Sequence, residues 1–286
     1  MDMSTGILPT VILACTLLAQ LPADEPFPAH RVIGNVYYVG SKNLAVYLIT
    51  TPEGHFIINS GFEDTVPLIR DSVESLDFRM QDIKYLLASH AHSDHVAGHA
   101  ALQRLTGAEV CVMRGDDGVI AAGGAGQYFY KDSRWAACPV DRRLHDNEQL
   151  QLGQTTLTAR WTPGHTRGCT TWTCRAGDGA ARQNVVIIGS PNVNPGFQLV
   201  DNPDYPEIAE HFAATFEVLK RLPCDVFLGA HGAYYGMLAK YQRVLAGSSD
   251  NPFIDPAGYR DYVTQKEKAF LAELAAQRKA AGSSSP

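Results

Sequence analysis

The stretch SHAHSDH, residues 89–95, places three histidines and one aspartate within six positions of the chain. It follows residues 83–88, an apolar run that predicts a buried strand. In extended backbone, alternate side chains point the same way, so His90 and His92 can reach one ion. Asp94 and His95 then point elsewhere, toward a second ion. Imidazole and carboxylate ligands suit Zn²⁺, which takes about four ligands and keeps one position for water in catalytic sites.

Four local ligands cannot complete two such sites, so each site needs a further ligand from elsewhere in the chain. His165 lies in the turn sequence TPGHT, residues 162–166, and His231 lies in LGAHG, residues 228–232. Pro and Gly let the backbone present a side chain at the end of a strand. Adding His165 and His231 gives three ligands per metal. The other histidines are interpreted as ordinary surface or core residues: His30, His55, His99, His145 and His211.

Outward from this motif, strands and helices are predicted in the same order twice. The first half has hairpin strands within residues 32–59, then a helix over 66–76, a strand over 83–88, a helix over 96–105 and a strand over 109–113. Residues 115–138, rich in Gly and aromatics, predict a long loop. The second half has strands over 149–152, 155–161, 170–174 and 185–189, a helix over 208–219, a strand over 224–228 and a helix over 262–279. With no linker between the halves, we expect a single domain over residues 24–286, with two sheets packed face to face and helices outside.

Composition limits the possible partners. The chain has 286 residues, of which 45% are hydrophobic, and a net charge of -6 with no basic cluster. It can therefore bury a substantial core, and it lacks the positive surface that nucleic acid or anionic lipid requires. We expect no nucleic-acid partner, no membrane span and a monomer.

The N-terminal residues carry an export signal pattern. The apolar run over residues 6–21 is shorter than the roughly 20 residues of a membrane span and has the length of a signal-peptide core. We therefore expect residues 1–23 to be a signal peptide and the protein to be periplasmic; a buried N-terminal segment is the alternative. The six cysteines (15, 111, 138, 169, 174 and 224) show no CxxC spacing, and in an exported protein they allow one or two disulfides.

The six metal-ligand candidates resemble the signature of the metallo-β-lactamase superfamily over roughly residues 32–245. The likeness assigns His90, His92 and His165 to a first zinc ion, and Asp94, His95 and His231 to a second. It implies an α/β fold, the four-layer αβ/βα sandwich of two mixed β-sheets with helices outside.

The residue after the strand 185–189 separates the branches of this superfamily. Glyoxalase-like hydrolases, lactonases and nucleases usually carry a bridging Asp there, and one lactamase subclass carries a zinc-binding Cys, whereas this chain has Ser190. With His90 intact and His95 as a ligand, the sequence resembles subclass B3 metallo-β-lactamases, as do residues 162–166, 194–197, 222–226 and 251–253. By this resemblance Ser190 and Asn192 hold the substrate carboxylate. Cys224 matches a cysteine often bonded to a C-terminal partner, and no Cys follows it.

The resemblance implies a zinc-dependent β-lactamase that confers antibiotic resistance. A zinc-bound hydroxide, available because zinc lowers the pKa of bound water toward about 7, would attack the β-lactam amide of penicillins, cephalosporins and carbapenems. Asp94 would be the catalytic residue that orients this nucleophile. The alternatives are a lactonase, thioesterase or phosphodiesterase of the same fold, and a non-catalytic zinc-binding protein. The aromatic residues Tyr128, Phe129, Tyr130 and Trp135 either cover the substrate or pin their loop to the core.

Overall fold

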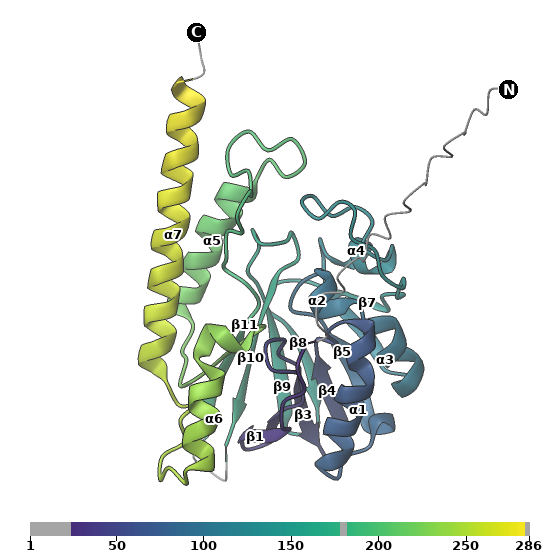
Figure 1. Ribbon diagram of the computed structural model, residues 1–286. Helices are drawn as coiled ribbons and strands as arrows, with labels where there is room; N and C mark the ends of the chain where they lie inside the picture. Colours follow the sequence, from purple (N-terminus) through teal and green to yellow (C-terminus); the bar gives the residue numbers. More distant parts are fainter. Residues whose placement is uncertain (1–23, 178–181, 284–286) are drawn as a thin grey trace, which may run out of the picture.

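The computed structural model describes residues 24–177 and 182–283 and contains two β-sheets (Figure 1). The first sheet has seven strands in chain order: β1 (His30–Ile33), β2 (Val36–Tyr38), β3 (Tyr47–Thr51), β4 (Gly54–Ile58), β5 (Ile83–Leu87), β6 (Glu109–Met113) and β7 (Arg142–Leu144). Strands β1 to β4 pair antiparallel in sequence order. Strands β4 to β7 pair parallel, because helices and longer loops carry the chain back between them.

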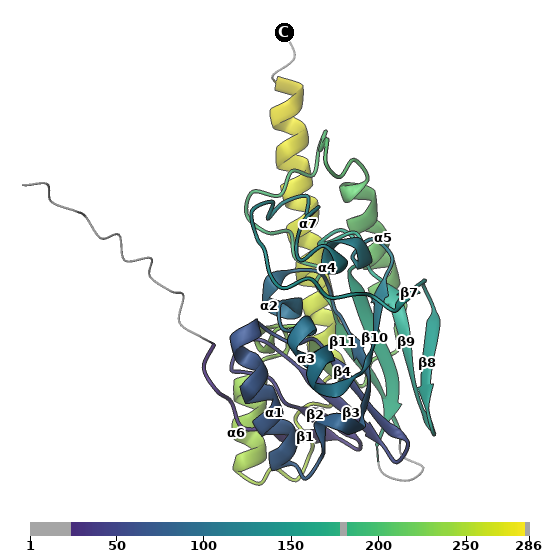
Figure 2. The same ribbon diagram turned by 90° about the vertical axis from the view of Figure 1, so that its right-hand side faces the viewer.

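The second sheet has five strands in the order β12-β11-β10-β9-β8. Their bounds are β8 (Glu148–Leu152), β9 (Thr155–Trp161), β10 (Thr170–Ala176), β11 (Gln183–Ile188) and β12 (Val226–Gly229). Only β11 and β12 pair parallel, and α5 (Ile208–Arg221) connects them. Figure 2 shows β8 at one edge of this sheet, next to β9.

Helices cover the outer faces of the two sheets. Figure 1 shows α1 (Val66–Ser75) and α3 (His99–Thr106) on one side, and α5 and α7 (Pro256–Ser283) on the other. Central strands are buried on both faces, which explains their continuous apolar sequences. In β4, for example, Phe56 and Ile58 face the core between the sheets, whereas Ile57 packs with α1 and α3. Phe212 of α5 stacks on Phe270 of α7, with ring centroids 5.5 Å apart. The predicted four-layer sandwich is confirmed.

Several elements differ from the sequence prediction. Residues 115–138 are not all loop, because they contain α4 (Asp117–Ala121). Strand β7 and helix α6 (Met237–Leu245) were not predicted, and α7 is longer than residues 262–279. The short remaining helices are α2 (Ser93–Val96), η1 (Glu63–Thr65), η2 (Met80–Asp82) and η3 (Gly232–Tyr235). Strand β7 lacks a signal because its three residues, RRL, carry no apolar pattern.

The described cysteines form no disulfide with one another. Cys224 is among them, and its side chain is half-buried. Cys15 and the expected signal peptide, residues 1–23, lie outside the described residues. Within residues 24–177 and 182–283, the structure has no helix of the length and apolar character that a membrane crossing requires.

Candidate metal centre

The six candidate ligands come from both sheets, at positions that follow strands. His90, His92, Asp94 and His95 lie between β5 and the end of α2, with His92 still extended at ψ 151°. His165 lies in the β9–β10 connection, after Gly164, whose φ of +123° favours glycine. His231 follows β12 directly. Strand ends from two sheets therefore converge on one place.

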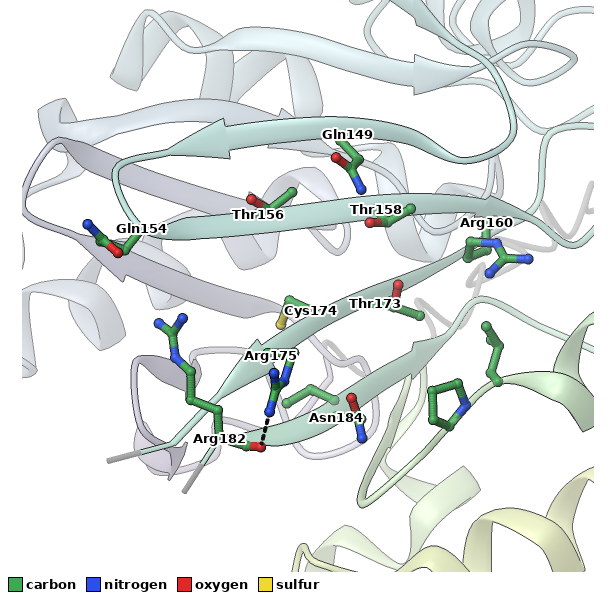
Figure 3. Close-up of a pocket in the computed structure, with 13 residues that line it drawn as sticks. Gln149, Gln154, Thr156, Thr158, Arg160, Thr173, Cys174, Arg175, Arg182 and Asn184 are labelled. Carbon is green, nitrogen blue, oxygen red and sulfur yellow. Dashed lines mark hydrogen bonds between the residues drawn. The ribbon is translucent and has the colours of Figure 1, made fainter. Parts of the chain in front are cut away.

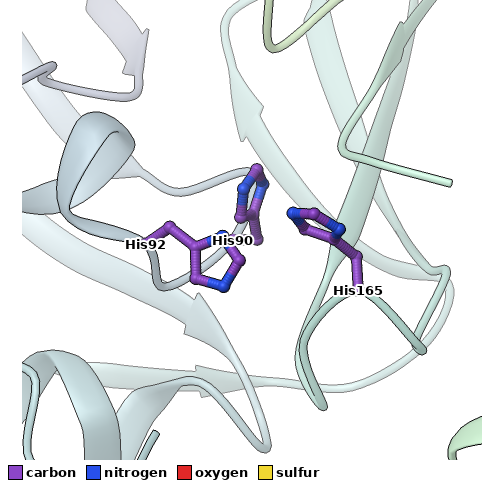
Figure 4. Close-up of side chains that lie close together, drawn as sticks. All are labelled: His90, His92 and His165. Atoms are coloured by element: carbon purple, nitrogen blue, oxygen red, sulfur yellow. The ribbon is translucent and has the colours of Figure 1, made fainter. Parts of the chain in front are cut away.

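The first group of ligands is His90, His92 and His165, whose rings point toward one another (Figure 4). All three side chains are buried. Each offers a nitrogen within 4.8 Å of the others. Three convergent imidazoles leave the fourth position of a tetrahedral ion open, the donor set of a catalytic zinc site.

The second group is Asp94, His95 and His231. The Nε2 atoms of His95 and His231 lie 3.1 Å apart. Asp94 Oδ2 lies 3.2 Å from the first of these atoms and 3.6 Å from the second. Two ligand atoms bound about 2.0–2.1 Å from one tetrahedral zinc ion are about 3.4 Å apart, so these separations fit a shared ion.

The ionisation states of these side chains suit metal binding. Burial lowers the pKa of His165 to about 4 and that of His231 to about 3. Burial also holds the pKa of His90 and His92 well below the ordinary value. Burial alone would raise the pKa of Asp94, but the adjacent rings of His95 and His231 lower it below its ordinary value. At neutral pH these four imidazoles are neutral and the carboxylate is ionised, as metal ligation requires.

Two neighbouring groups orient the ligands. His165 donates its Nδ1–H to the backbone oxygen of Asn192 at 2.7 Å, which leaves Nε2 free for a metal. Asn59, at φ 70°, accepts the backbone N–H of Ser89 at 2.8 Å and donates to the backbone oxygen of Ala45 at 3.2 Å. Asn is one of the few residues that adopt this left-handed conformation readily.

Asp116 is a third supporting residue, and no sequence motif distinguishes it. Its buried carboxylate accepts hydrogen bonds from the backbone N–H of Ala91, the hydroxyl of Thr166 and the backbone N–H of Gly168. Burial raises its pKa to about 6, and the three donors oppose this rise. At neutral pH the group is therefore mostly a carboxylate.

A cavity of about 380 Å³ opens onto the metal ligands. Its lining includes His90, His92, Asp94, His165 and His231, together with polar and aromatic neighbours: Phe62, Ser93, Gln127, Tyr130, Ser133, Asn194 and Tyr234. Such a cavity is large enough to receive a small molecule beside the metals.

Of the four aromatic residues in the 115–138 segment, Tyr130 covers the cleft. Its ring lies edge-on to His92 at 4.9 Å, and its hydroxyl accepts a hydrogen bond from Asn194 at 2.9 Å. Phe129 instead packs against Phe197, with ring centroids 4.7 Å apart. The hydroxyl of Tyr128 donates to the backbone oxygen of His165 at 3.1 Å. Trp135 packs against the hydrophobic cluster on the helix-covered face of the first sheet.

Ser190 and Asn192 lie behind Tyr234 and are absent from the lining of the cleft. The Ser190 hydroxyl lies 3.2 Å from the Tyr234 hydroxyl, and the Asn192 side-chain amide donates to that hydroxyl at 2.7 Å. Tyr234 itself lines the cleft. Tyr234 was not predicted from the sequence, because it stands three residues after the ligand His231 and belongs to no recognisable motif.

A second cavity, of about 420 Å³, lies on the outer face of β8 to β11 (Figure 3). Thr156, Thr158 and Arg160 line it at alternate positions of β9, as expected for the solvent face of an amphipathic strand. It contains no histidine and no carboxylate. Although it is larger than the metal cleft, it lacks the histidine and carboxylate ligands that a catalytic zinc ion requires.

Comparisons with known proteins agree with this geometry. Residues 43–231 match the family model described as the metallo-beta-lactamase superfamily. The chain is 45% identical to the native FEZ-1 metallo-beta-lactamase from Legionella gormanii, with a TM-score of 0.87, over 90% of this chain and 99% of that one. It is 35% identical to BJP-1, a subclass B3 metallo-beta-lactamase of Bradyrhizobium japonicum, with a TM-score of 0.83, over 90% and 97% of the two chains.

More distant relatives share only part of the chain. A "Probable metallo-hydrolase" of Burkholderia pseudomallei is 30% identical over 121 residues, which is 40% of this chain and 40% of that protein. The human mitochondrial persulfide dioxygenase ETHE1 is 27% identical over 109 residues, 38% of this chain and 34% of that protein. The chain thus aligns with less than half the length of these curated relatives.

Proposed function

Since the chain belongs to the metallo-beta-lactamase superfamily, we propose that it is a subclass B3 metallo-β-lactamase that binds two zinc ions and hydrolyses the β-lactam amide. The observation that carries this proposal is the composition of the second ligand group. His95 and His231 complete it with Asp94, while the position after β11 holds Ser190, which is neither a carboxylate nor a thiol. The resemblance to the solved subclass B3 enzyme extends over nearly the whole of that chain.

The ligand geometry defines what each residue contributes. Two zinc ions, when bound, supply an activated water at neutral pH and positive charge for the oxyanion that develops on the amide. Asp94 is ionised and belongs to the second group, so its carboxylate would accept a hydrogen bond from the attacking water and orient it. His90, His92 and His165 would hold the other ion through nitrogens that lie within 4.8 Å of one another.

The far side of the cleft offers groups for the carboxylate of a β-lactam. We assign this role to the cluster of Ser190, Asn192 and Tyr234, in which Tyr234 lines the cleft and its hydroxyl contacts the other two side chains. Penicillins, cephalosporins and carbapenems share a carboxylate beside the scissile amide. A cluster that binds this shared carboxylate would accept substrates of all three classes.

The other functions considered from the sequence have no support in the site. A lactonase, thioesterase or phosphodiesterase of this fold would be expected to carry a bridging Asp where this chain has Ser190, whose hydroxyl contacts Tyr234. A non-catalytic zinc protein has no use for an open cleft of about 380 Å³ beside the ligands.

Hydrolysis assays with metal control test the proposal. Purified full-length chain should hydrolyse a penicillin, a cephalosporin and a carbapenem, lose this activity after treatment with a chelator, and regain it when zinc is added back. A zinc-loaded protein that leaves all three substrates intact would disprove the function. Activity that survives complete removal of metal would disprove the mechanism.

We also propose that the protein acts in the periplasm, where β-lactams meet their targets. The support is the apolar run over residues 6–21, which has the length of a signal-peptide core. Mass spectrometry of the protein from a periplasmic extract should give an N-terminus near residue 24. Recovery of the intact N-terminus from the cytoplasmic fraction alone would contradict this location.

A further inference from the structure

The first group of metal ligands spans the two halves of the fold. His90 and His92 follow β5 of the first sheet, whereas His165 lies between β9 and β10 of the second. The three nitrogens can converge only if these two loops are held at a fixed separation. A group that fastens one loop to the other would therefore govern how well the site is formed before a metal arrives.

Asp116 makes this connection. It follows β6 of the first sheet, and its side chain is 1% exposed. Its Oδ2 accepts the backbone N–H of Ala91 at 2.7 Å and the hydroxyl of Thr166 at 2.7 Å, and its Oδ1 accepts the backbone N–H of Gly168 at 2.8 Å. Ala91 stands between His90 and His92, and Thr166 follows His165. One carboxylate thus touches residues adjacent to all three ligands.

The backbones on either side of this carboxylate also touch directly. A Cβ atom on Gly168 would lie 2.5 Å from the backbone nitrogen of Asp116, and a Cβ on Gly115 would lie 2.8 Å from the carbonyl carbon of Arg167. Gly115 has a φ of +103°, a conformation that favours glycine. No side chain intervenes between the two segments, so the carboxylate is held at close range and has little freedom to move.

The other hydrogen bonds between these regions lie nearer the strands. The backbone N–H of Thr170 donates to Ser89 at 2.7 Å, and the indole N–H of Trp172 donates to Ala88 at 2.9 Å. These bonds fasten β10 to the end of β5. Among the described residues, Asp116 is the one carboxylate that accepts hydrogen bonds from both ligand-bearing loops.

We propose that Asp116 is a positioning residue that sets the metal affinity of the His90, His92 and His165 group by clamping its two loops together. Taking the metal as zinc rests on the function proposed above. Asp116 does not touch the metal or the substrate in this assignment. Its effect passes through the backbone of Ala91 and the side chain of Thr166.

The chemistry of the clamp predicts a graded series of variants. All three partners are donors, so Asp116→Asn keeps one accepting oxygen but turns an amide N–H₂ toward a donor in either orientation. Asp116→Ala removes all three hydrogen bonds. Thr166→Val removes one bond and leaves the carboxylate in place. Affinity should therefore fall in the order wild type, Thr166→Val, Asp116→Asn, Asp116→Ala.

Asp225 provides a matched control. Its Oδ2 accepts the backbone N–H and the side-chain amide of Asn184, both at 2.8 Å, near the start of β11. Ser190 follows the opposite end of that strand, in contact with Tyr234. Asp225→Ala thus removes a comparable carboxylate tie at a distance from the metal ligands.

The test measures zinc affinity separately from stability. Each full-length variant is stripped of metal and titrated with zinc against a chromophoric chelator, and thermal unfolding of the metal-free form is recorded in parallel. Loss of an outer partner of a metal ligand costs about 10- to 100-fold in affinity, so Asp116→Ala should bind its first zinc ion at least about 10-fold more weakly than wild type. Asp225→Ala should lower the unfolding temperature but keep zinc affinity within about 2-fold, because it touches no ligand-bearing loop.

Activity adds an independent readout. The hydrolysis rate of Asp116→Asn should fall at limiting zinc and recover when zinc is in excess, because the reacting groups are intact. Unchanged zinc affinity in Asp116→Ala overturns the proposal; if that variant does not fold, unchanged affinity in both Asp116→Asn and Thr166→Val does so. A wild-type protein that binds zinc but hydrolyses no β-lactam refutes the proposed function and leaves this affinity comparison valid.

Discussion

His165 and Asn192 are joined by a hydrogen bond of 2.7 Å from the imidazole Nδ1–H to the backbone carbonyl oxygen. The residue expected from sequence to bind the substrate therefore also orients a metal ligand. It does so through its main chain, while its side chain binds Tyr234. The two contributions of Asn192 can be separated experimentally, because a side-chain substitution leaves the carbonyl in place.

Asn192→Ala should weaken substrate binding without weakening zinc binding. It removes one hydrogen bond from the Tyr234 hydroxyl, and a bond of this kind contributes about 0.5–1.5 kcal/mol, so the KM for a penicillin should rise about 2- to 10-fold. Zinc content after dialysis should equal that of wild type. A loss of zinc with an unchanged KM would show that the side chain supports the metal site instead.

Tyr234→Phe removes the hydroxyl shared by Ser190 and Asn192 but keeps the ring beside His231, at a centroid distance of 5.0 Å. We expect a rise in KM of about 2- to 10-fold, measured by steady-state kinetics. Tyr235→Phe is the control, because its hydroxyl contacts that of Tyr47 in the core at 3.1 Å. That variant should lose stability while its KM stays constant; equal KM values in both variants would exclude a binding role for Tyr234.

In the segment of residues 115–138, Tyr130 covers the cleft and Phe129 anchors the segment to the core. Tyr130 is 40% exposed over His92, so Tyr130→Ala should change the KM for bulky cephalosporins with little effect on stability. Phe129 is half-buried against Phe197, so Phe129→Ala should lower the free energy of unfolding by about 1–3 kcal/mol. Urea unfolding and kinetics on both variants check this division. Deleting residues 124–130 without any change in KM for several β-lactams would disprove the covering role.

Burial of His99 should contribute to the loss of folding stability in acid. Burial lowers its pKa to about 3, against about 6.5 in an unfolded chain. Between these values the unfolded chain binds a proton that the folded chain does not, so stability falls as pH falls, by up to about 1.4 kcal/mol per pH unit. Above about pH 6.5 neither state binds the proton and the effect ends.

His99→Gln should therefore flatten the loss of stability in acid. The free energy of unfolding of the metal-free protein, measured in urea between about pH 4 and 7, should depend less on pH than in wild type. The exposed His145 is the control, and His145→Gln should keep the wild-type slope. Parallel slopes for wild type and His99→Gln would show that burial of His99 does not couple folding to protons.

The sequence predicts the parts of this molecule whose signals are local. Residues 155–161 and 109–113 alternate or run apolar as strands do, and they form β9 and β6 with those bounds. The ligands are equally local, because one short segment holds four of them and a glycine-containing turn marks each of the others. The predicted roles of Ser190 and Asn192 in substrate binding stay predictions.

The supporting groups could not be predicted, because their partners are distant in sequence. Asp116 contacts residues 25, 50 and 52 positions away, and its own segment, GDDG, reads only as a turn. Nothing local distinguishes Asp116 from Asp117, whose carboxylate instead pairs with Arg143. Asp116, and not Asp117, meets the ligand-bearing loops because the end of β6 packs beside the β9–β10 turn of the second sheet.

Because the ligands are spread over both halves of the chain, they become available at different times during synthesis. His90 and His92 emerge from the ribosome long before His165, and the second group waits for His231. A nascent chain cannot hold even the first ion in its final geometry until the second sheet has begun to form. Metal binding is thus a late event in the folding of this polypeptide, because it requires loops from both sheets.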